Sequence, residues 1–461
     1  MASNEEPASA PSLEEAFATP ARALEGAAEA AEQGERAVMS KVPFKLAEEY
    51  WDTLGPGLTT GAADNDPSGI VTYSQAGARY GFQLLWMPLF TFPFMAVVQE
   101  MCARIGVASG RGLAANIRRH HSAGALYTVT ALLFFANALN IAADLGAMAA
   151  ATRLLVPGLA FELLVVLFAG ASLLLQVFTT YARYAKYLKY LTLTLFSYVA
   201  VALAVHLDWG AALTHTLVPS LTFSRNQLFL VAAVLGTTIS PYLFFWQTSQ
   251  EVEEEELAGE TTLSARRAGA SRHAVRKMRV DVWSGMFFSN LVAFFIFVTC
   301  AGTLYAHGIT NIETAGEAAL ALRPFGEFAY LFFAAGIIGT GLLAVPVLAA
   351  SSAYAFAESF GWKAGLYRKL KQAYAFYGVI IVSMLLGIIA NLLHLDPIKG
   401  LLWAAVGNGL IAPVILFFVV RLSANRAVMG EHANRPLTSL IGWATVALMT
   451  LSGFAAIVSL L

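Results

Sequence analysis

The sequence predicts an all-α polytopic membrane protein with eleven transmembrane helices, arranged as two inverted five-helix repeats followed by one additional helix. Three observations predict this fold class. Of the 461 residues, 57% are hydrophobic and only 13% are charged. This hydrophobic fraction exceeds what a soluble domain needs for its core. Lysine and arginine are concentrated in alternate loops, and two apolar spans are interrupted by proline and glycine.

Each apolar span is near or above the ~20 residues that cross a hydrocarbon core of ~30 Å. Their approximate limits are residues 54–80, 84–107, 124–150, 160–181, 187–208, 226–250, 281–306, 326–356, 374–394, 398–421 and 438–461. Ahead of them, residues 1–49 contain ten glutamates and four Lys/Arg and have no apolar face. This composition predicts a disordered cytoplasmic tail.

The placement of basic residues predicts the orientation. With the N-terminus in the cytoplasm, the cytoplasmic connections contain 20 Lys/Arg and the opposite connections contain 5. Because cytoplasmic loops carry the excess of positive charge, we expect a cytoplasmic N-terminus and an extracytoplasmic C-terminus. The expected location is the plasma (inner) membrane, with multiple passes and the lipid bilayer as the surrounding partner.

The first span is interrupted at Asp66-Pro67-Ser68-Gly69. Proline removes a backbone donor, and glycine costs about 1 kcal/mol against alanine in a helix. A charged residue at membrane depth is by default a functional-site hypothesis, so Asp66 predicts a cation site.

The sixth span contains a second break around Pro241. Interrupted helices at corresponding positions of two halves indicate a transporter's midplane site. We therefore expect a first inverted repeat at 50–208, a second at 209–422, and an additional eleventh helix within 423–461.

Other polar residues of the apolar spans have more than one interpretation. Asp144 and Asn140 share one helix face, and either form an ion or proton relay or are a buried carboxylate with its neighbour. Glu358 is expected at the membrane interface. The acidic run Glu253–Glu256 is expected to be solvated, at the point where the sixth helix frays.

Several motifs resemble those of the Nramp divalent-metal transporters, over nearly all of residues 50–461. The matching positions are Gly55-Pro56-Gly57, Asp66-Pro67, Gln75-Ala76-Gly77, Tyr80-Gly81, Leu84-Leu85-Trp86, Gln99, Ala103-Arg104, Gly110-Arg111, Ala143-Asp144, Pro241, Met429-Gly430-Glu431 and Asn434-Arg435. This resemblance implies a LeuT-like fold with a metal site between the two broken helices.

The sequence departs from the Nramp pattern at the positions that bind metal in that family. The family's Asp-Pro-Gly-Asn is here Asp66-Pro67-Ser68-Gly69, and its Met-Pro-His is Ser240-Pro241-Tyr242. A second family histidine falls at Gln247, and a third-helix glutamate falls at Ala147. This pattern resembles the Nramp-related magnesium transporters.

The resemblance implies a set of metal-site residues. Asp66 is the one charged ligand, and the backbone carbonyl of Thr237 is the second. Gly69 and Ser240 line the space for the ion's water shell, and Asn408 is a candidate for the wall. A methionine thioether favours transition metals, so its replacement by Ser240 fits Mg²⁺, which prefers oxygen ligands and keeps several waters.

We therefore expect a monomeric secondary transporter that takes up Mg²⁺, and also Mn²⁺, without proton coupling. The metal is the transported substrate, and no cofactor is expected. A proton-coupled Mn²⁺/Fe²⁺ symporter of the Nramp type is the main alternative, and a sodium-coupled organic-solute transporter and a channel are others.

The spans contain no zinc motif, paired carboxylates or nucleophile–base spacing, so an enzyme is not expected. Nucleic acid is not an expected partner.

Overall fold

The computed structural model describes residues 50–460 apart from 52, 180, 206, 311, 313–316, 320, 321, 324, 325 and 394–396. The predicted tail at 1–49 lies outside these residues. Contacts divide the chain after Leu54, and the fold reported below is that of the unit from Gly55 onward. The part of this unit that the structure describes contains helices and loops and no strand.

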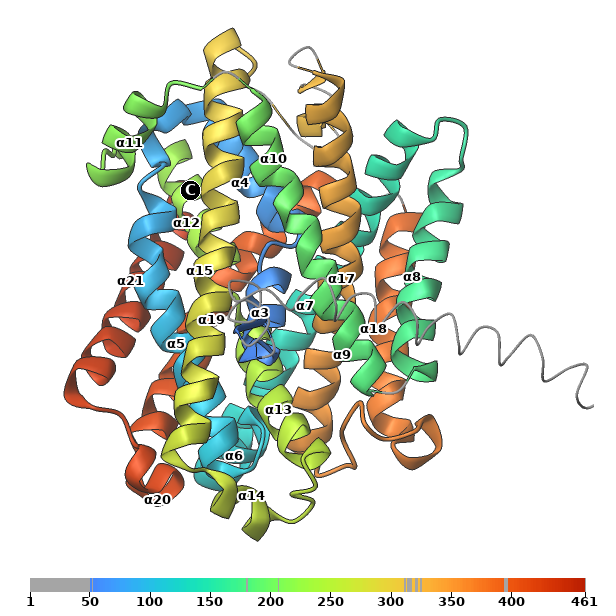
Figure 1. Ribbon diagram of the computed structural model, residues 1–461, viewed down its shortest axis with the longest axis vertical. Coiled ribbons are helices and arrows are strands. Elements are labelled where there is room, and N and C mark those ends of the chain that lie inside the picture. Colours follow the sequence, from blue (N-terminus) through green and yellow to red (C-terminus); the bar gives the residue numbers. More distant parts are fainter. Residues whose placement is uncertain are drawn as a thin grey trace, which may run out of the picture. The chain divides into compact units, whose positions relative to one another are not determined.

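Each predicted span coincides with a helix or a pair of consecutive helices (Figure 1). These are α3 (Pro56–Ala63) with α4 (Pro67–Tyr80), α5 (Met87–Ser109), α7 (Ala123–Leu155), α8 (Phe161–Phe178), α9 (Tyr181–Leu191) with α10 (Phe196–Ala204), α12 (Arg225–Thr238) with α13 (Pro241–Leu257), α15 (Arg272–Thr303), α17 (Glu327–Phe360), α18 (Tyr374–Leu392), α19 (Pro397–Ala424) and α21 (Pro436–Leu460).

In the part of the chain that the structure describes, fewer helices than the eleven predicted spans are, taken singly, long and apolar enough to cross a membrane. Within the described residues, nine helices are long and apolar enough to cross a membrane. A tenth span is obtained if Pro67–Leu84 and Met87–Ser109, which are bent by 110° relative to each other, count as one. Pro67–Leu84 and Met87–Ser109, which belong to the first two predicted spans, thus satisfy the length and hydropathy requirement only together. The all-helical membrane fold class is confirmed, and the repeat boundaries stay a prediction.

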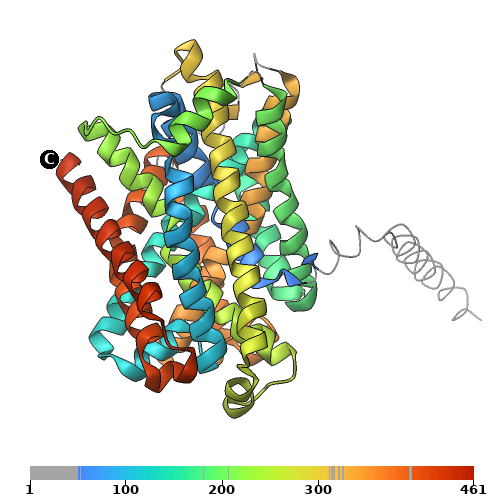
Figure 2. The ribbon, with the colours of Figure 1, turned by 60° about the vertical axis from the view of Figure 1, so that its left-hand side comes forward.

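Short helices connect the long ones at the two ends of this unit. Three of them, α6 (Leu113–His120), α14 (Leu263–Gly269) and α20 (Arg426–Met429), lie at the same end, whereas α11 (Trp209–Leu217) lies at the other (Figures 1 and 2). The three that share one end contain or adjoin most of the loop arginines. The alternation of basic loops along the sequence therefore corresponds to a spatial separation.

Both predicted helix breaks are present. Helix α3 ends at Ala63 and α4 begins at Pro67, while α12 ends at Thr238 and α13 begins at Pro241. In both cases the new helix starts with proline, whose missing N–H and fixed φ suit the first helical position but end the preceding helix.

Helix α3 is held tightly against α15. A β-carbon on Gly285 would lie 2.0 Å from the carbonyl oxygen of Gly57, and one on Gly61 would lie 2.1 Å from that of Gly285. Small residues let two membrane helices approach this closely. At the start of α3, the Asp281 carboxylate of α15 accepts hydrogen bonds from the N–H groups of Gly55, Gly57 and Leu58 at 2.7 to 3.0 Å.

The expectation that the acidic run Glu253–Glu256 is solvated where the sixth helix frays was wrong. Helix α13 continues to Leu257 without fraying, and Glu253 is 2% exposed. Its carboxylate accepts hydrogen bonds from the Tyr354 hydroxyl at 2.6 Å and the Leu366 N–H at 2.7 Å. Glu358 is partly buried and accepts a hydrogen bond from the Ser249 hydroxyl at 3.0 Å, while its expected position at the membrane interface stays a prediction. Neighbouring helices supply donors that sequence spacing does not reveal.

Candidate cation site between the two broken helices

Asp66 lies at the first break, where it caps the N-terminus of α4. Its Oδ1 accepts hydrogen bonds from the Gly69 N–H and the Ser68 hydroxyl, both at 2.7 Å. The residue is 2% exposed. A carboxylate at a helix N-terminus is stabilised by these donors and by the helix dipole. Both of these hydrogen bonds end on Oδ1.

Gly69 lies where the two breaks face each other. A β-carbon there would lie 3.0 Å from Thr237 Oγ1, 3.3 Å from Asp66 Oδ1 and 3.4 Å from the Asp64 carbonyl oxygen. A larger side chain would thus enter a group of three oxygens that come from both broken helices. The structure therefore brings Asp66, Gly69 and Thr237 together.

Ser240 joins this group through Thr237. The Ser240 hydroxyl donates a hydrogen bond of 2.6 Å to the Thr237 carbonyl, and a longer one of 3.3 Å to the carbonyl of Gly236. Thr237 and Ser240 are each 1% exposed. The Thr237 carbonyl was expected to be released by the helix break, but the Ser240 side chain satisfies it. A carbonyl has two lone pairs, so this hydrogen bond leaves one acceptor position on Thr237.

Two buried polar residues at the first break were missed by the sequence analysis. Asp64 is 1% exposed, and its Oδ2 accepts a hydrogen bond of 2.8 Å from the Ser289 hydroxyl, whereas its Oδ1 has no partner. The Asn65 amide donates to the same hydroxyl at 3.0 Å. The sequence signal that could have identified this site is Asp64 itself, two residues before Asp66. Two acids in one unwound segment are costly in an apolar span.

A third missed contact connects the two broken helices directly. The Tyr242 hydroxyl, from the first turn of α13, donates a hydrogen bond of 2.8 Å to the Ala63 carbonyl at the end of α3. Tyr242 and Ala63 are both fully buried. The side chain of Tyr242 thus spans from one break to the other.

Helix α7 places further unsatisfied polar atoms near this site. Neither carboxylate oxygen of Asp144 and neither amide atom of Asn140 has a hydrogen-bond partner, and both residues are fully buried. Asp144 interacts electrostatically with Asp66. On α19, Oδ1 of Asn408 is also buried without a partner. Buried polar groups are normally paired, so the unpaired carboxylate of Asp144 fits a site that receives a cation and its water.

The two remaining departures from the Nramp pattern have separate places. Gln247 donates a hydrogen bond of 2.7 Å to Glu251 within α13, and its Oε1 has no partner. Ala147 is buried on α7, one turn beyond Asp144. Among the described residues, no three His, Cys, Asp or Glu side chains form a cluster that could hold a metal ion. A metal here would depend on carboxylate, backbone and hydroxyl oxygens together.

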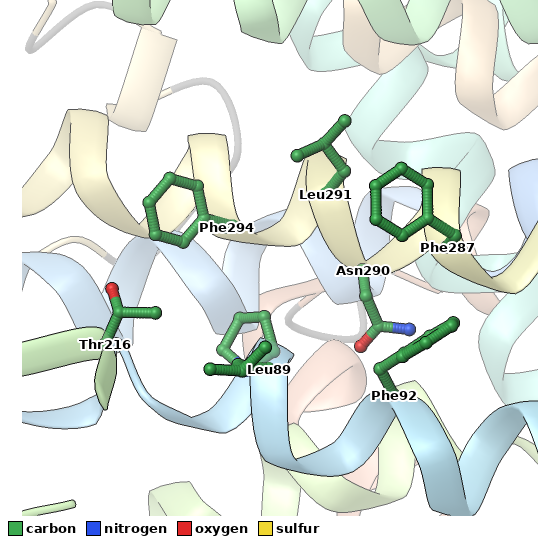
Figure 3. Close-up of a pocket in the computed structure, with 8 residues that line it drawn as sticks. Leu89, Phe92, Thr216, Phe287, Asn290, Leu291 and Phe294 are labelled. Carbon is green, nitrogen blue, oxygen red and sulfur yellow. The ribbon is translucent and has the colours of Figure 1, made fainter. Parts of the chain in front are cut away.

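An apolar cavity of about 220 Å³ lies elsewhere, between α5, α11 and α15 (Figure 3). Its wall is mostly phenylalanine and leucine, and its polar residues are Thr216 and Asn290. The Asn290 amide already donates to the Met286 carbonyl at 2.9 Å. None of the predicted site residues lines this cavity, so its chemistry is unrelated to that of the helix breaks.

Comparisons with known proteins agree with this architecture. The family model described as "Natural resistance-associated macrophage protein-like" matches residues 57–459. The divalent metal cation transporter MntH of Klebsiella pneumoniae is 27% identical over 421 residues, which cover 88% of this chain and 94% of that protein.

Two solved structures have a similar fold. A manganese transporter from Eremococcus coleocola has a TM-score of 0.66 at 18% identity, covering 88% of this chain and 86% of that one. Mhp1, a nucleobase-cation-symport-1 family transporter, has a TM-score of 0.55 at 14% identity, covering 88% and 91%. Similarity at these identities concerns the fold alone.

Proposed function

Since the chain belongs to the Nramp family, we propose that it is a secondary transporter that moves Mg²⁺, and also Mn²⁺, into the cytoplasm by alternating access. The coarser conclusion is that it is a multi-pass membrane transporter of a divalent metal cation rather than an enzyme. The identity of the ion is the proposal. We place the ion between the two broken helices, where it is bound by Asp66 and retains part of its water shell.

The position of Gly69 is the observation that carries this proposal. Where the family pattern has asparagine, this chain has no side chain, and the space that a side chain would fill adjoins three oxygens of Thr237, Asp66 and Asp64. Mg²⁺ requires octahedral oxygen coordination and loses water reluctantly. A site that offers oxygens and room for water is therefore better suited to Mg²⁺ than a close-fitting site with a thioether.

The absence of histidine supports transport without proton coupling. Residues 56–80 and 225–257, which form the two broken helices, contain no histidine. Histidine is the side chain whose ordinary pKa suits proton exchange near neutral pH. A dication needs no coupled proton for uptake, because the membrane potential is worth ~2.3 kcal/mol per charge per 100 mV.

The basic end of the protein supports the proposed orientation in the membrane. Helices α6, α14 and α20 share that end (Figure 1). Arginines are crowded there: burial lowers the pKa of Arg111, and the nearby charges of Arg119 and Arg267 lower it further. Positive loops remain in the cytoplasm, so we assign this end to the cytoplasm and the end of α21 to the outside of the plasma membrane.

A liposome assay tests both parts of the proposal. Purified protein is reconstituted with a Mg²⁺ dye and a pH dye enclosed, and an inward Mg²⁺ gradient and potential are applied. We expect Mg²⁺ to enter without acidification of the interior. Failure of Mg²⁺ to enter contradicts the choice of ion, whereas acidification that depends on Mg²⁺ contradicts uncoupled transport.

A proton-coupled Mn²⁺/Fe²⁺ symporter is the second candidate. It is favoured by the names of the similar proteins, which include a manganese transporter. It is also favoured by Asp144, a buried acid without a hydrogen-bond partner that could carry a proton. Competition separates the candidates, because excess Mg²⁺ would leave Mn²⁺ uptake unchanged in this second case.

A further inference from the structure

The two prolines at the helix breaks each leave one backbone carbonyl without its helical donor. In an α-helix the carbonyl of residue i accepts from the N–H of residue i+4. The partner of Ala63 would be Pro67, and the partner of Thr237 would be Pro241. Because proline has no N–H, neither carbonyl can be satisfied in this way. Both residues are 1% exposed or less.

Two hydroxyl groups from the start of α13 supply the missing donors. The Ser240 hydroxyl donates to the Thr237 carbonyl at 2.6 Å, and the Tyr242 hydroxyl donates to the Ala63 carbonyl at 2.8 Å. The first hydrogen bond lies within the second broken helix. The second crosses to the first broken helix, so α13 satisfies an orphaned carbonyl at each break.

These carbonyls would otherwise be strong ligands. Unwound backbone carbonyls in broken membrane helices are typical cation ligands of transporters. A carbonyl that already accepts a hydrogen bond has one lone pair fewer and less negative charge to offer to an ion. The hydrogen bond to Ala63, three residues before Asp66, places the Tyr242 hydroxyl at the first break, where the charges of Asp66 and Asp144 also act on it.

We propose that Tyr242, assisted by Ser240, is a specificity-determining residue that weakens two backbone carbonyls as ligands of the transported ion. The inference rests on the proposed function, because it explains how the site takes an ion with its water. With one lone pair of each carbonyl occupied, the carbonyls are weaker ligands and the ion keeps more of its hydration shell. Such a site favours an ion that dehydrates reluctantly, as Mg²⁺ does, over one that exchanges water for protein ligands more readily.

The variant Tyr242→Phe tests this role, since it removes one hydroxyl and keeps the ring. Purified wild-type and variant proteins are reconstituted in liposomes, and uptake of Mg²⁺ and Mn²⁺ is measured separately and in competition. A net hydrogen bond is small in free energy, so we expect the preference for Mn²⁺ over Mg²⁺ to rise roughly three- to tenfold. An unchanged preference would overturn the inference.

A matched control is available in Tyr330. Its hydroxyl also donates to a carbonyl in the last turn of a helix, that of Leu154, at 2.6 Å. This contact joins α17 and the end of α7, and it involves neither helix break. Tyr330→Phe is therefore expected to leave the ratio of Mn²⁺ to Mg²⁺ uptake unchanged. An equal shift in this control would attribute the effect to a general loosening of the fold and overturn the role of Tyr242.

A second variant keeps the test valid if Tyr242→Phe does not fold. Ser240→Ala releases the Thr237 carbonyl and is expected to shift the preference in the same direction, and no shift would overturn the inference.

Mg²⁺ uptake by the wild-type protein distinguishes failure of this inference from failure of the proposed function. If the wild-type protein transports Mg²⁺ and the variants do not change selectivity, this inference fails and the proposed function stands. If it does not transport Mg²⁺, the proposed function itself fails.

Discussion

Gly69 of α4 and Thr237 of α12 face each other across the two helix breaks, so closely that a β-carbon on Gly69 would lie 3.0 Å from Thr237 Oγ1. The variant Gly69→Asn would fill this space with an amide. We expect Mg²⁺ uptake to fall roughly tenfold, since overpacking of a buried site costs on the order of 1–3 kcal/mol and the water shell loses its room. Mn²⁺ uptake should fall less, which a flux assay with both ions measures.

The control for this variant is Gly378→Asn on α18, where a β-carbon would have no atom within 4 Å. It introduces the same amide into a helix away from the breaks. Equal losses of Mg²⁺ uptake in the two variants would show that the amide acts through folding. The space beside Thr237 would then have no special part in binding the ion.

The Asp281 carboxylate is expected to hold α3 in its observed position. Asp281→Asn removes the charge and turns an amide donor toward the N–H groups of Gly55, Gly57 and Leu58. Hydrogen bonds to a charged group are worth roughly 1.5–3 kcal/mol each. Without these hydrogen bonds α3 should leave its place more often and expose its buried residues. Thr60 of α3 is fully buried. We therefore expect a cysteine introduced by Thr60→Cys to react at least about tenfold faster with a thiol reagent in the Asp281→Asn protein than in the parent protein.

Glu431→Gln is the control for this labelling measurement, because it weakens an exposed ion pair with Arg272 at the same end of the protein. Exposed ion pairs contribute little, so its labelling rate should equal that of the parent. An unchanged rate in Asp281→Asn would mean that these three hydrogen bonds do not hold α3 in place.

The glycine contact between α3 and α15 predicts a change in stability. In Gly285→Ala the new β-carbon would lie 2.0 Å from the carbonyl oxygen of Gly57, and relief of this clash requires the helices to separate. We expect a loss of about 1–3 kcal/mol, measured as a lower thermal unfolding midpoint. Gly378→Ala should raise the thermal unfolding midpoint, because alanine is a better helix former than glycine. A midpoint for Gly285→Ala at or above that of the wild type would contradict the contact.

Much of this architecture could be predicted because its signals are local. Span length, loop charge and the two proline breaks are properties of short sequence segments, and the structure contains helices at every predicted span. The breaks at Pro67 and Pro241 were predictable since proline removes a donor wherever it occurs. The 110° bend between Pro67–Leu84 and Met87–Ser109 was not, because it depends on tertiary packing.

The site was predictable only in part, since tertiary contacts decide which group satisfies each orphaned atom. Asp66, Gly69, Thr237 and Ser240 could be selected from the breaks and the family pattern. That Tyr242 reaches Ala63, and that Ser289 reaches Asp64, depends on residues more than 170 positions apart in the sequence. The burial of Glu253 was predicted wrongly for the same reason, because its donors come from α17 and the loop after it.

The most direct test of the account is Mg²⁺ uptake by reconstituted Asp66→Ala. Asp208→Ala is the matched control, because Asp208 also caps a helix, accepting from the Ala211 N–H at 3.0 Å, but is placed at the N-terminus of α11. A site that loses its charged ligand cannot compensate the dehydration of a dication. We predict that Asp66→Ala reduces Mg²⁺ uptake to the level of empty liposomes, while Asp208→Ala retains wild-type uptake. Wild-type uptake by correctly folded Asp66→Ala would contradict the account.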